Sequence, residues 1–120
     1  MNKATKSVSR DELLAMNDLG GEEIFIAKWN MKAWIRELSA AERNELFALS
    51  MDGTKWNGKR FSINLTIACL CDVSTQKPIF TQADYDAVSN KSGVALDQIE
   101  AVALRVNAIG DNFEKAAEKN

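Results

Sequence analysis

One short stretch constrains the fold of this chain more than any other, because it ends an extended segment and starts a helix. It reads Ile35-Arg-Glu-Leu-Ser-Ala-Ala-Glu-Arg43. Ser39 and Glu42 have the spacing of a capping box, in which the Ser hydroxyl and the Glu carboxylate each accept a backbone N–H of the first helical turn. The spacing predicts a helix over 40–51, directly after an aromatic-rich extended segment.

Similar spacings mark three further helix starts. They lie at Ser9…Glu12, Thr81…Asp84 and Asp111…Glu114, the last two with acidic partners in a weaker form. The first two predict short helices over 10–16 and 82–89. The third starts a charged, partly helical tail over 111–120.

The best-defined helix is predicted over 93–109. Its apolar residues recur every three or four positions, as on one buried face: Ala95, Ile99, Val102, Val106 and Ile109. Gly110 follows directly, and glycine commonly terminates helices. We therefore expect one face of this helix to be buried.

The segment before Ser39 is rich in β-branched and aromatic residues, which favour strands. Its simplest interpretation is an antiparallel hairpin with strands over 23–29 and 32–38 and a turn near Asn30-Met31. An isolated hairpin is only marginally stable in water. We therefore expect one face of this hairpin to be covered by helices.

The segment 61–73 fits two structures. Apolar residues occupy every odd position, which indicates a strand: Phe61, Ile63, Leu65, Ile67, Cys69, Cys71 and Val73. The even positions Ala68 and Leu70 are apolar too, and the run is long for a strand, so a helix buried nearly all round fits as well. A central buried helix is favoured; the strand alternative would add a third strand to the hairpin.

Length and composition indicate a single domain. The chain has 120 residues, of which 46% are hydrophobic and 27% charged, as in ordinary globular proteins. We expect a disordered N-terminus over 1–8, one domain over 9–110 and the charged tail over 111–120. The predicted fold class is α+β, mainly α, with the N-terminal hairpin packed on a layer of about four to five helices.

Several classes of function are disfavoured by what the sequence lacks. It contains no histidine, the commonest general base and metal ligand, and no glycine-rich phosphate loop, so no catalytic, cofactor-binding or metal site is predicted. The net charge of −2 argues against nucleic-acid binding. No apolar run suits a membrane span or a signal peptide, so we expect a cytoplasmic protein whose Cys69 and Cys71 are buried, reduced thiols.

Candidate residues for partner binding come from two regions. Trp56 lies beside Lys55 in the glycine-flanked loop 52–58, and an exposed Trp on a mobile loop is a suitable contact anchor. Trp29 and Trp34 lie in the predicted hairpin, where core filling is the simpler role and an exposed strand edge the functional one.

A third candidate surface lies near the C-terminus. Leu104 falls off the predicted buried face of its helix, and a single exposed Leu usually has no function. Together with Phe113 and Ala116 it would form a patch for self-association.

In order along the chain, these segments resemble the tail assembly chaperones of long-tailed bacteriophages. The resemblance covers about 7–118 and rests on an ordered set of segments: Ile24-Phe-Ile-Ala-Lys-Trp29, Trp34-Ile-Arg-Glu-Leu-Ser-Ala-Ala-Glu-Arg43, Leu65-Thr-Ile-Ala-Cys-Leu-Cys-Asp72, Lys77-Pro-Ile-Phe-Thr81, Asn90-Lys-Ser92 and Ala103-Leu-Arg-Val-Asn107. The loop around Trp56 departs from the family pattern, so its role is not implied by the resemblance.

The resemblance implies a non-enzymatic protein of the host bacterial cytoplasm. Such proteins bind the tape measure protein, keep it soluble during tail assembly and are absent from the mature virion. A longer form made by ribosomal frameshifting contacts the tail tube protein, and self-association occurs. The alternative is a structural minor tail or tail-completion protein that is retained in the virion.

Overall fold

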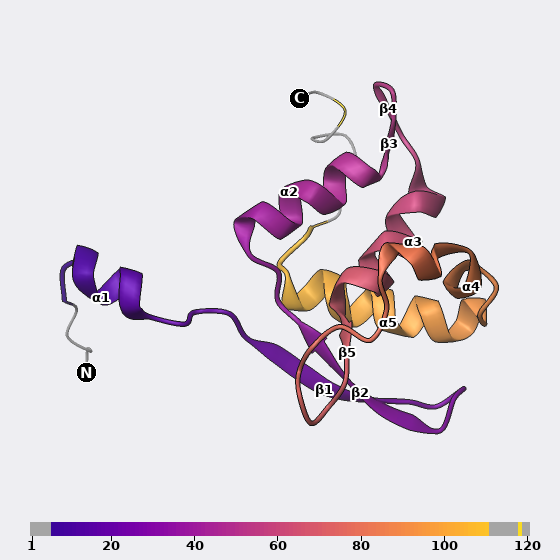
Figure 1. Ribbon diagram of the computed structural model, residues 1–120, viewed down its shortest axis with the longest axis horizontal. Helices are drawn as coiled ribbons and strands as arrows, with labels where there is room; N and C mark the ends of the chain where they lie inside the picture. Colours follow the sequence, from indigo (N-terminus) through magenta and orange to yellow (C-terminus); the bar gives the residue numbers. More distant parts are fainter. Residues whose placement is uncertain (1–5, 111–117, 119–120) are drawn as a thin grey trace.

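The computed structural model describes residues 6–110 and residue 118. A three-stranded sheet lies against a group of helices, and a short N-terminal helix stands apart from both (Figure 1). In chain order the elements are α1 (Arg10–Ala15), β1 (Gly21–Ile26), β2 (Met31–Arg36), α2 (Ala40–Leu49), β3 (Met51–Asp52), β4 (Lys55–Trp56), α3 (Gly58–Cys69), β5 (Leu70–Cys71), the 3₁₀ turn η1 (Gln82–Asp84), α4 (Tyr85–Ser89) and α5 (Gly93–Val106). The predicted α+β, mainly α class with an N-terminal hairpin is confirmed.

The hairpin forms as predicted, but its strands end earlier. β1 pairs antiparallel with β2 in a register that places Ile26 opposite Met31. The turn spans 27–30, where Trp29 N donates to Ile26 O and Asn30 takes a left-handed φ of 55°. Trp29 was predicted at the end of a strand, and it lies in the turn because Asn30 tolerates this conformation well.

The segment 61–73 contains both structures that its pattern fits. The favoured helix is confirmed: α3 begins after Asn57, whose side chain accepts from Arg60 N at 3.0 Å, and it continues to Cys69. Residues 70–71 then form β5, which pairs Leu70 with Ile35 in the sheet. Strand-like alternation arises in α3 because α2, α4, α5 and the sheet surround it, so that nearly every side is buried.

The capping box that predicted α2 is present. Ser39 Oγ accepts from Glu42 N at 3.2 Å, and Ser39 N donates to the Glu42 carboxylate at 2.9 Å. The helix ends at Leu49 rather than at 51, because Met51 enters the two-stranded ladder of β3 and β4. The loop predicted to be mobile around Trp56 is therefore a small hairpin in this structure.

The other predicted helix starts have mixed outcomes. Ser9 Oγ accepts from Glu12 N at the start of α1, and Thr81 N donates to Asp84 at 2.8 Å before η1 and α4. The start predicted at Asp111 lies outside the described residues.

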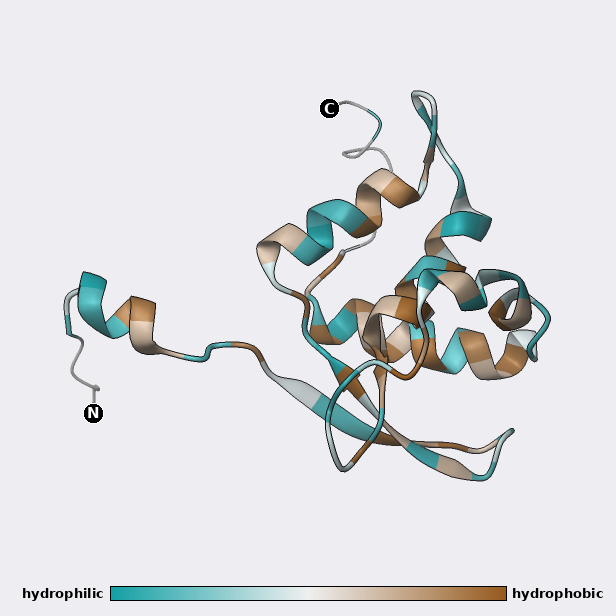
Figure 2. Ribbon diagram, in the orientation of Figure 1, coloured by the Kyte–Doolittle hydropathy of each residue, from teal (hydrophilic) through white to brown (hydrophobic). Residues whose placement is uncertain are grey.

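The core lies between the sheet and helices α2, α3, α4 and α5. Its fully buried side chains include Ile35 from the central strand, Leu65 from α3 and Ile99 from α5. By contrast, α1 buries no residue, and its Leu13 and Leu14 are exposed. Figure 2 shows hydrophobic positions on α1 held away from the body of the molecule. No helix within the described residues is long and apolar enough to cross a membrane.

The end of α5 differs from its prediction. The helix stops at Val106 rather than at 109, and the left-handed residue after it is Ala108, with φ 54°, rather than Gly110. Ile109 N donates to Leu104 O at 2.9 Å and Ala108 N donates to Arg105 O at 3.1 Å, which is the Schellman pattern. The helix ends early because the Asn107 side chain is bound to the neighbouring backbone, as described below.

Replacing Ala108 by Gly is expected to stabilise the protein by about 1 kcal/mol, because a left-handed conformation costs an alanine about this much and a glycine almost nothing. The measurement is the free energy of unfolding by urea titration. The matched control is Ala101→Gly at an exposed position inside the same helix, which is expected to lose about 1 kcal/mol. A loss of stability in both variants would contradict the prediction.

Candidate functional site

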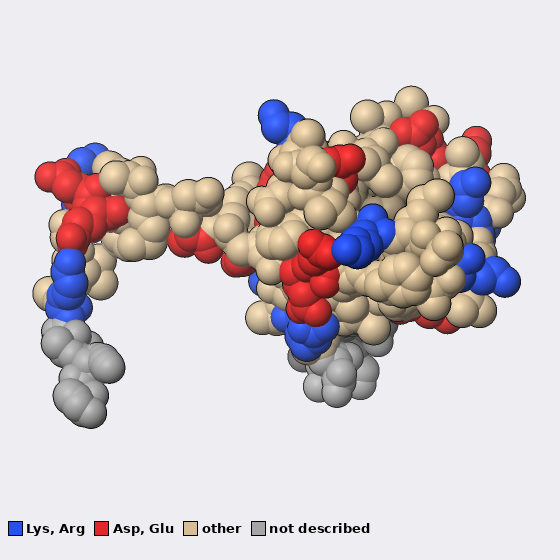
Figure 3. All heavy atoms as spheres, turned by 90° about the horizontal axis from the view of Figure 1, so that it is seen from below, with Lys and Arg blue, Asp and Glu red and all other residues tan. Residues whose placement is uncertain are grey.

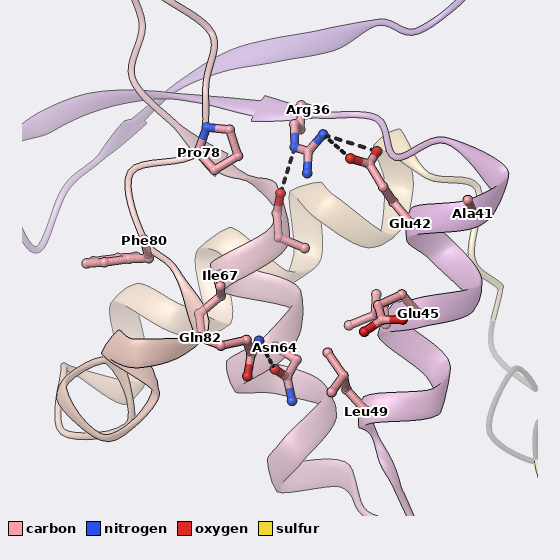
Figure 4. Close-up of a pocket in the computed structure, with 12 residues that line it drawn as sticks. Arg36, Ala41, Glu42, Glu45, Leu49, Asn64, Ile67, Pro78, Phe80 and Gln82 are labelled. Atoms are coloured by element: carbon pink, nitrogen blue, oxygen red, sulfur yellow. Dashed lines mark hydrogen bonds and ion pairs between the residues drawn. The ribbon is translucent and has the colours of Figure 1, made fainter.

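A groove runs between α2 and the segment 78–82, with α3 as its floor (Figure 4). Its volume is about 410 Å³. The residues that line it are Arg36, Ala41, Glu42, Glu45, Leu46, Leu49, Asn64, Ile67, Ala68, Pro78, Phe80 and Gln82. Most of them are apolar, so the groove suits the side chains of another polypeptide better than a charged small molecule.

One end of the groove is fixed by Arg36. Its Nε donates to Ala68 O at 2.7 Å, which engages one of the last carbonyls of α3. One of its terminal nitrogens contacts both carboxylate oxygens of Glu42, at 3.0 and 3.1 Å. A single side chain therefore joins β2, the end of α3 and the start of α2.

Glu42 remains ionised at this junction. The backbone N–H of Ser39 lowers the pKa of Glu42 most. Burial, the next largest effect, opposes it, and Arg36 lowers the pKa further. Because the carboxylate is already engaged by the cap and by Arg36, it serves to hold α2 in place. The more exposed acid of the groove wall is Glu45, one turn further along α2.

The opposite wall is held to the floor by an amide pair. Gln82 Nε2 donates to Asn64 Oδ1 at 2.6 Å, and Asn64 Nδ2 donates to Arg60 O at 2.8 Å. Asn64 is only 4% exposed, so its side chain needs these partners. Figure 4 shows the pair at the base of the groove, below Phe80 and Ile67. This pair sets the distance between the 78–82 segment and α3.

Cys69 and Cys71 are buried thiols rather than activated nucleophiles. Burial raises the pKa of the Cys69 thiol to about 12, and it also raises the pKa of Cys71, so neither is a thiolate near neutral pH. Among residues 6–110 and 118, no group of three or more acidic or cysteine side chains is placed to hold a metal ion.

The structure places the predicted contact residues in different environments. Trp56 is half-buried rather than exposed: its ring centroid lies 5.0 Å from that of Phe61 and 6.0 Å from that of Phe47. Its backbone N–H also donates to Glu118 at 2.7 Å. The premise of a freely exposed Trp on a mobile loop is therefore corrected, while Lys55 beside it is exposed.

The hairpin tryptophans lie on two sides of the sheet. Trp29 is half-buried in the turn and packs against the core. Trp34 is half-buried on the opposite face, where its ring covers Gly21. The two do not form one continuous contact surface.

Leu104, which was predicted to belong to a self-association patch, does not lie where it was expected. Leu104 is half-buried and packs against the core, which corrects the expectation that it lies off the buried face. Its predicted neighbours Phe113 and Ala116 lie outside the described residues.

Sequence reasoning did not identify the groove. Its α2 wall is the row Ala41, Glu45 and Leu49, which recurs every fourth residue along one side of the helix. This spacing was the available signal, but at the start of α2 only the capping pair of Ser39 and Glu42 was recognised. The other wall depends on how the 78–82 segment packs on α3, which no local pattern encodes.

The described residues form a small α+β fold, mainly α, with a largely apolar groove between α2 and the 78–82 segment. No protein-family model matches the sequence, and comparison with curated proteins gives no significant match. The fold is similar to that of the solved tail assembly chaperone of bacteriophage HK97. The TM-score is 0.60 at 20% sequence identity, and the match covers 83% of this chain and 95% of that one. The resemblance stated from the sequence is thus confirmed at the level of the fold.

Proposed function

We propose that this chain is a phage tail assembly chaperone that binds the tape measure protein and keeps it soluble during tail assembly. The observation that carries the proposal is the apolar groove on a fold shared with a tail assembly chaperone. A tape measure protein is a long, largely helical chain with apolar stripes. A groove with helical walls accepts such a stripe as a set of side chains spaced by three and four residues.

The proposed chemistry of binding follows from the groove lining. Apolar side chains of the client would cover Leu49, Ile67 and Phe80, and a basic side chain would face Glu45 on the wall. Binding stabilises the uncoated client by mass action, and several copies along one client add avidity. No bond is made or broken, so the role is non-enzymatic and needs no cofactor.

The wider role is part of the same proposal. The protein would act in the host bacterial cytoplasm and leave before the virion is complete, and a longer frameshifted form would contact the tail tube protein. Mass spectrometry of purified virions tests this role against the alternative of a structural minor tail or tail-completion protein. A chaperone is expected to be absent, and a stoichiometric presence in the virion would overturn the proposal.

Blocking the groove is expected to weaken client binding at least about tenfold, a change of about 1.4 kcal/mol in binding free energy. Ala41 is an exposed wall residue, so Ala41→Trp fills the groove without disturbing the core. The measurement is the amount of soluble tape measure protein recovered on co-expression, followed by affinity measurement with a soluble client fragment.

The matched control is Ala48→Trp, on the same helix and exposed outside the groove lining. It is expected to bind the client as the wild-type chain does. Equal binding by the Ala41 and Ala48 variants would reject the groove as the client site. Failure of the wild-type chain to keep the client soluble would reject the function itself.

A further inference from the structure

A second apolar surface lies at the tip of the β1–β2 hairpin. Two shallow hollows of about 350 and 340 Å³ meet there, and both are lined by Trp29, Met31 and Ile79. We call these three residues the tip patch. Phe80 lines one of these hollows as well as the groove described above, so the two surfaces adjoin but have different linings.

The tip patch is unusually exposed for its composition. Met31 is 63% exposed although it pairs with the buried Ile26, and Ile79 is 51% exposed although its backbone N–H donates to the buried Leu70. Trp29 supports them from the turn, where it packs against the core. Methionine is a flexible, polarisable side chain that adapts to different partners, and a partly buried Trp offers a rigid contact surface.

The charged residues around the tip patch are mainly basic. Lys91 lines one hollow, and the exposed Lys28 precedes Trp29 in the turn. Lys32 lines the other hollow, and its ammonium group lies 3.8 Å from Glu23. In the view of Figure 3, the end of the body opposite the N-terminal arm is largely uncharged surface with several basic groups, and acidic groups lie at its upper and lower margins.

The acidic neighbours do not cancel this charge. Asp72 lines a hollow, but its Oδ1 accepts from the backbone N–H groups of Ser74 and Thr75 at 2.8 and 2.9 Å. Glu23 and Lys32 are 3.8 Å apart, which makes a weak, exposed ion pair. The three lysines Lys28, Lys32 and Lys91 therefore outnumber the two acidic residues near the patch.

We propose that the tip patch binds an amphipathic polypeptide segment that carries carboxylates beside its apolar side chains. The apolar side chains cover Met31 and Ile79, and the carboxylates face Lys28 and Lys91. The preference for acid is opposite to that of the client groove, whose wall presents Glu45. The inference goes beyond the proposed function and does not depend on it, because it assigns a second surface to a partner of different chemistry.

The probes are two synthetic amphipathic peptides with leucine on one face. One carries glutamate beside the leucines, and the other carries lysine at the same positions. The full chain is titrated with each peptide, and its backbone amide NMR signals are followed. The acidic peptide is expected to bind at least about tenfold more tightly, to shift the signals of 28–32, 79 and 91, and to weaken as salt is raised.

Two pairs of variants locate the site. The double variant Met31→Ser, Ile79→Ser is expected to reduce binding of the acidic peptide at least about tenfold. The control is Val94→Ser, because Val94 is 71% exposed on α5, and it should leave binding unchanged. The double variant Lys28→Glu, Lys91→Glu is expected to reverse the preference, so that the basic peptide binds more tightly. The control Lys59→Glu, at the start of α3, should keep the preference for the acidic peptide.

Several results would overturn the inference. They are equal affinity for the two peptides, no binding of the acidic peptide, or signal shifts confined to the groove. The same holds if the Met31 and Ile79 changes alter only the oligomeric state, because a second copy of the chain would then be the occupant. Each of these results leaves the test of the client groove through Ala41 unaffected.

Discussion

Replacing Asn107 by Ala is expected to lower the free energy of unfolding by about 3 kcal/mol, because a buried backbone N–H loses its partner and the side chain loses several hydrogen bonds at once. Asn107 is 4% exposed. Its Oδ1 accepts from Leu38 N at 2.8 Å, and its Nδ2 donates to Ala103 O at 2.9 Å. With Ala at this position, the Leu38 N–H remains buried without that acceptor.

Asn107 also helps to hold the α2 wall of the groove in place. Its backbone carbonyl accepts from Arg43 at 3.0 Å, and its Nδ2 lies 3.4 Å from Arg36 O. The residue thus ties the end of α5 to the end of β2 and the start of α2, which forms one wall of the groove. Client binding is therefore expected to fall together with stability.

Urea unfolding monitored by circular dichroism measures this effect. The matched control is Asn90→Ala, since Asn90 is exposed and its Nδ2 donates to Asp86 O within the same short helix region. We expect it to lose less than about 1 kcal/mol, as is usual for surface positions. A loss below 1 kcal/mol in the Asn107 variant would contradict the role assigned to this residue.

Replacing Gly21 by Ala is expected to cost about 2 kcal/mol, because overpacking forces neighbouring groups to shift. A Cβ atom at Gly21 would lie 2.5 Å from both Cε2 and Nε1 of the Trp34 ring. Glycine is needed here for space, because the indole covers the start of β1. The Trp34 ring must rotate away or β1 must move, and either change weakens the outer face of the hairpin.

A double-mutant cycle separates this steric effect from other causes. Trp34→Ala removes the obstructing ring, so Gly21→Ala is expected to cost almost nothing in that background, and the two changes should be non-additive by more than about 1 kcal/mol. Gly93→Ala is the control, since nothing lies within 4 Å of the Cβ it would add. If the effects of the Gly21 and Trp34 changes on the free energy of unfolding were strictly additive, the clash between the added Cβ and the Trp34 ring would not explain the loss of stability.

Local patterns predicted the elements of this fold more successfully than their ends. The Ser39 capping box placed the start of α2 correctly, because both of its hydrogen bonds join residues three apart. The end of α5 was misplaced. Gly110 was the obvious terminator, but the helix stops at Val106, where Asn107 hydrogen-bonds to Leu38, 69 positions away.

The groove was the least predictable feature. Its walls come from α2 and from 78–82, and the Gln82 and Asn64 side chains that link wall to floor are 18 positions apart. The Trp56 loop was the more conspicuous candidate from its composition. In the structure that ring packs beside Phe47 and Phe61. A large aromatic side chain next to other aromatic rings has a lower free energy when it is buried against them than when it is exposed to water.

By itself, the sequence determined where α1, α2 and α5 begin, which segment forms a hairpin and which classes of chemistry are disfavoured. These properties depend on contacts within a few residues or on composition alone. Only the tertiary structure decided that Leu70 and Cys71 add a third strand, that Ala108 takes the left-handed position and that α2 faces Phe80 across a groove. The physical reason is that burial and long-range hydrogen bonds select among local conformations of similar energy, and only the packed chain brings those partners together.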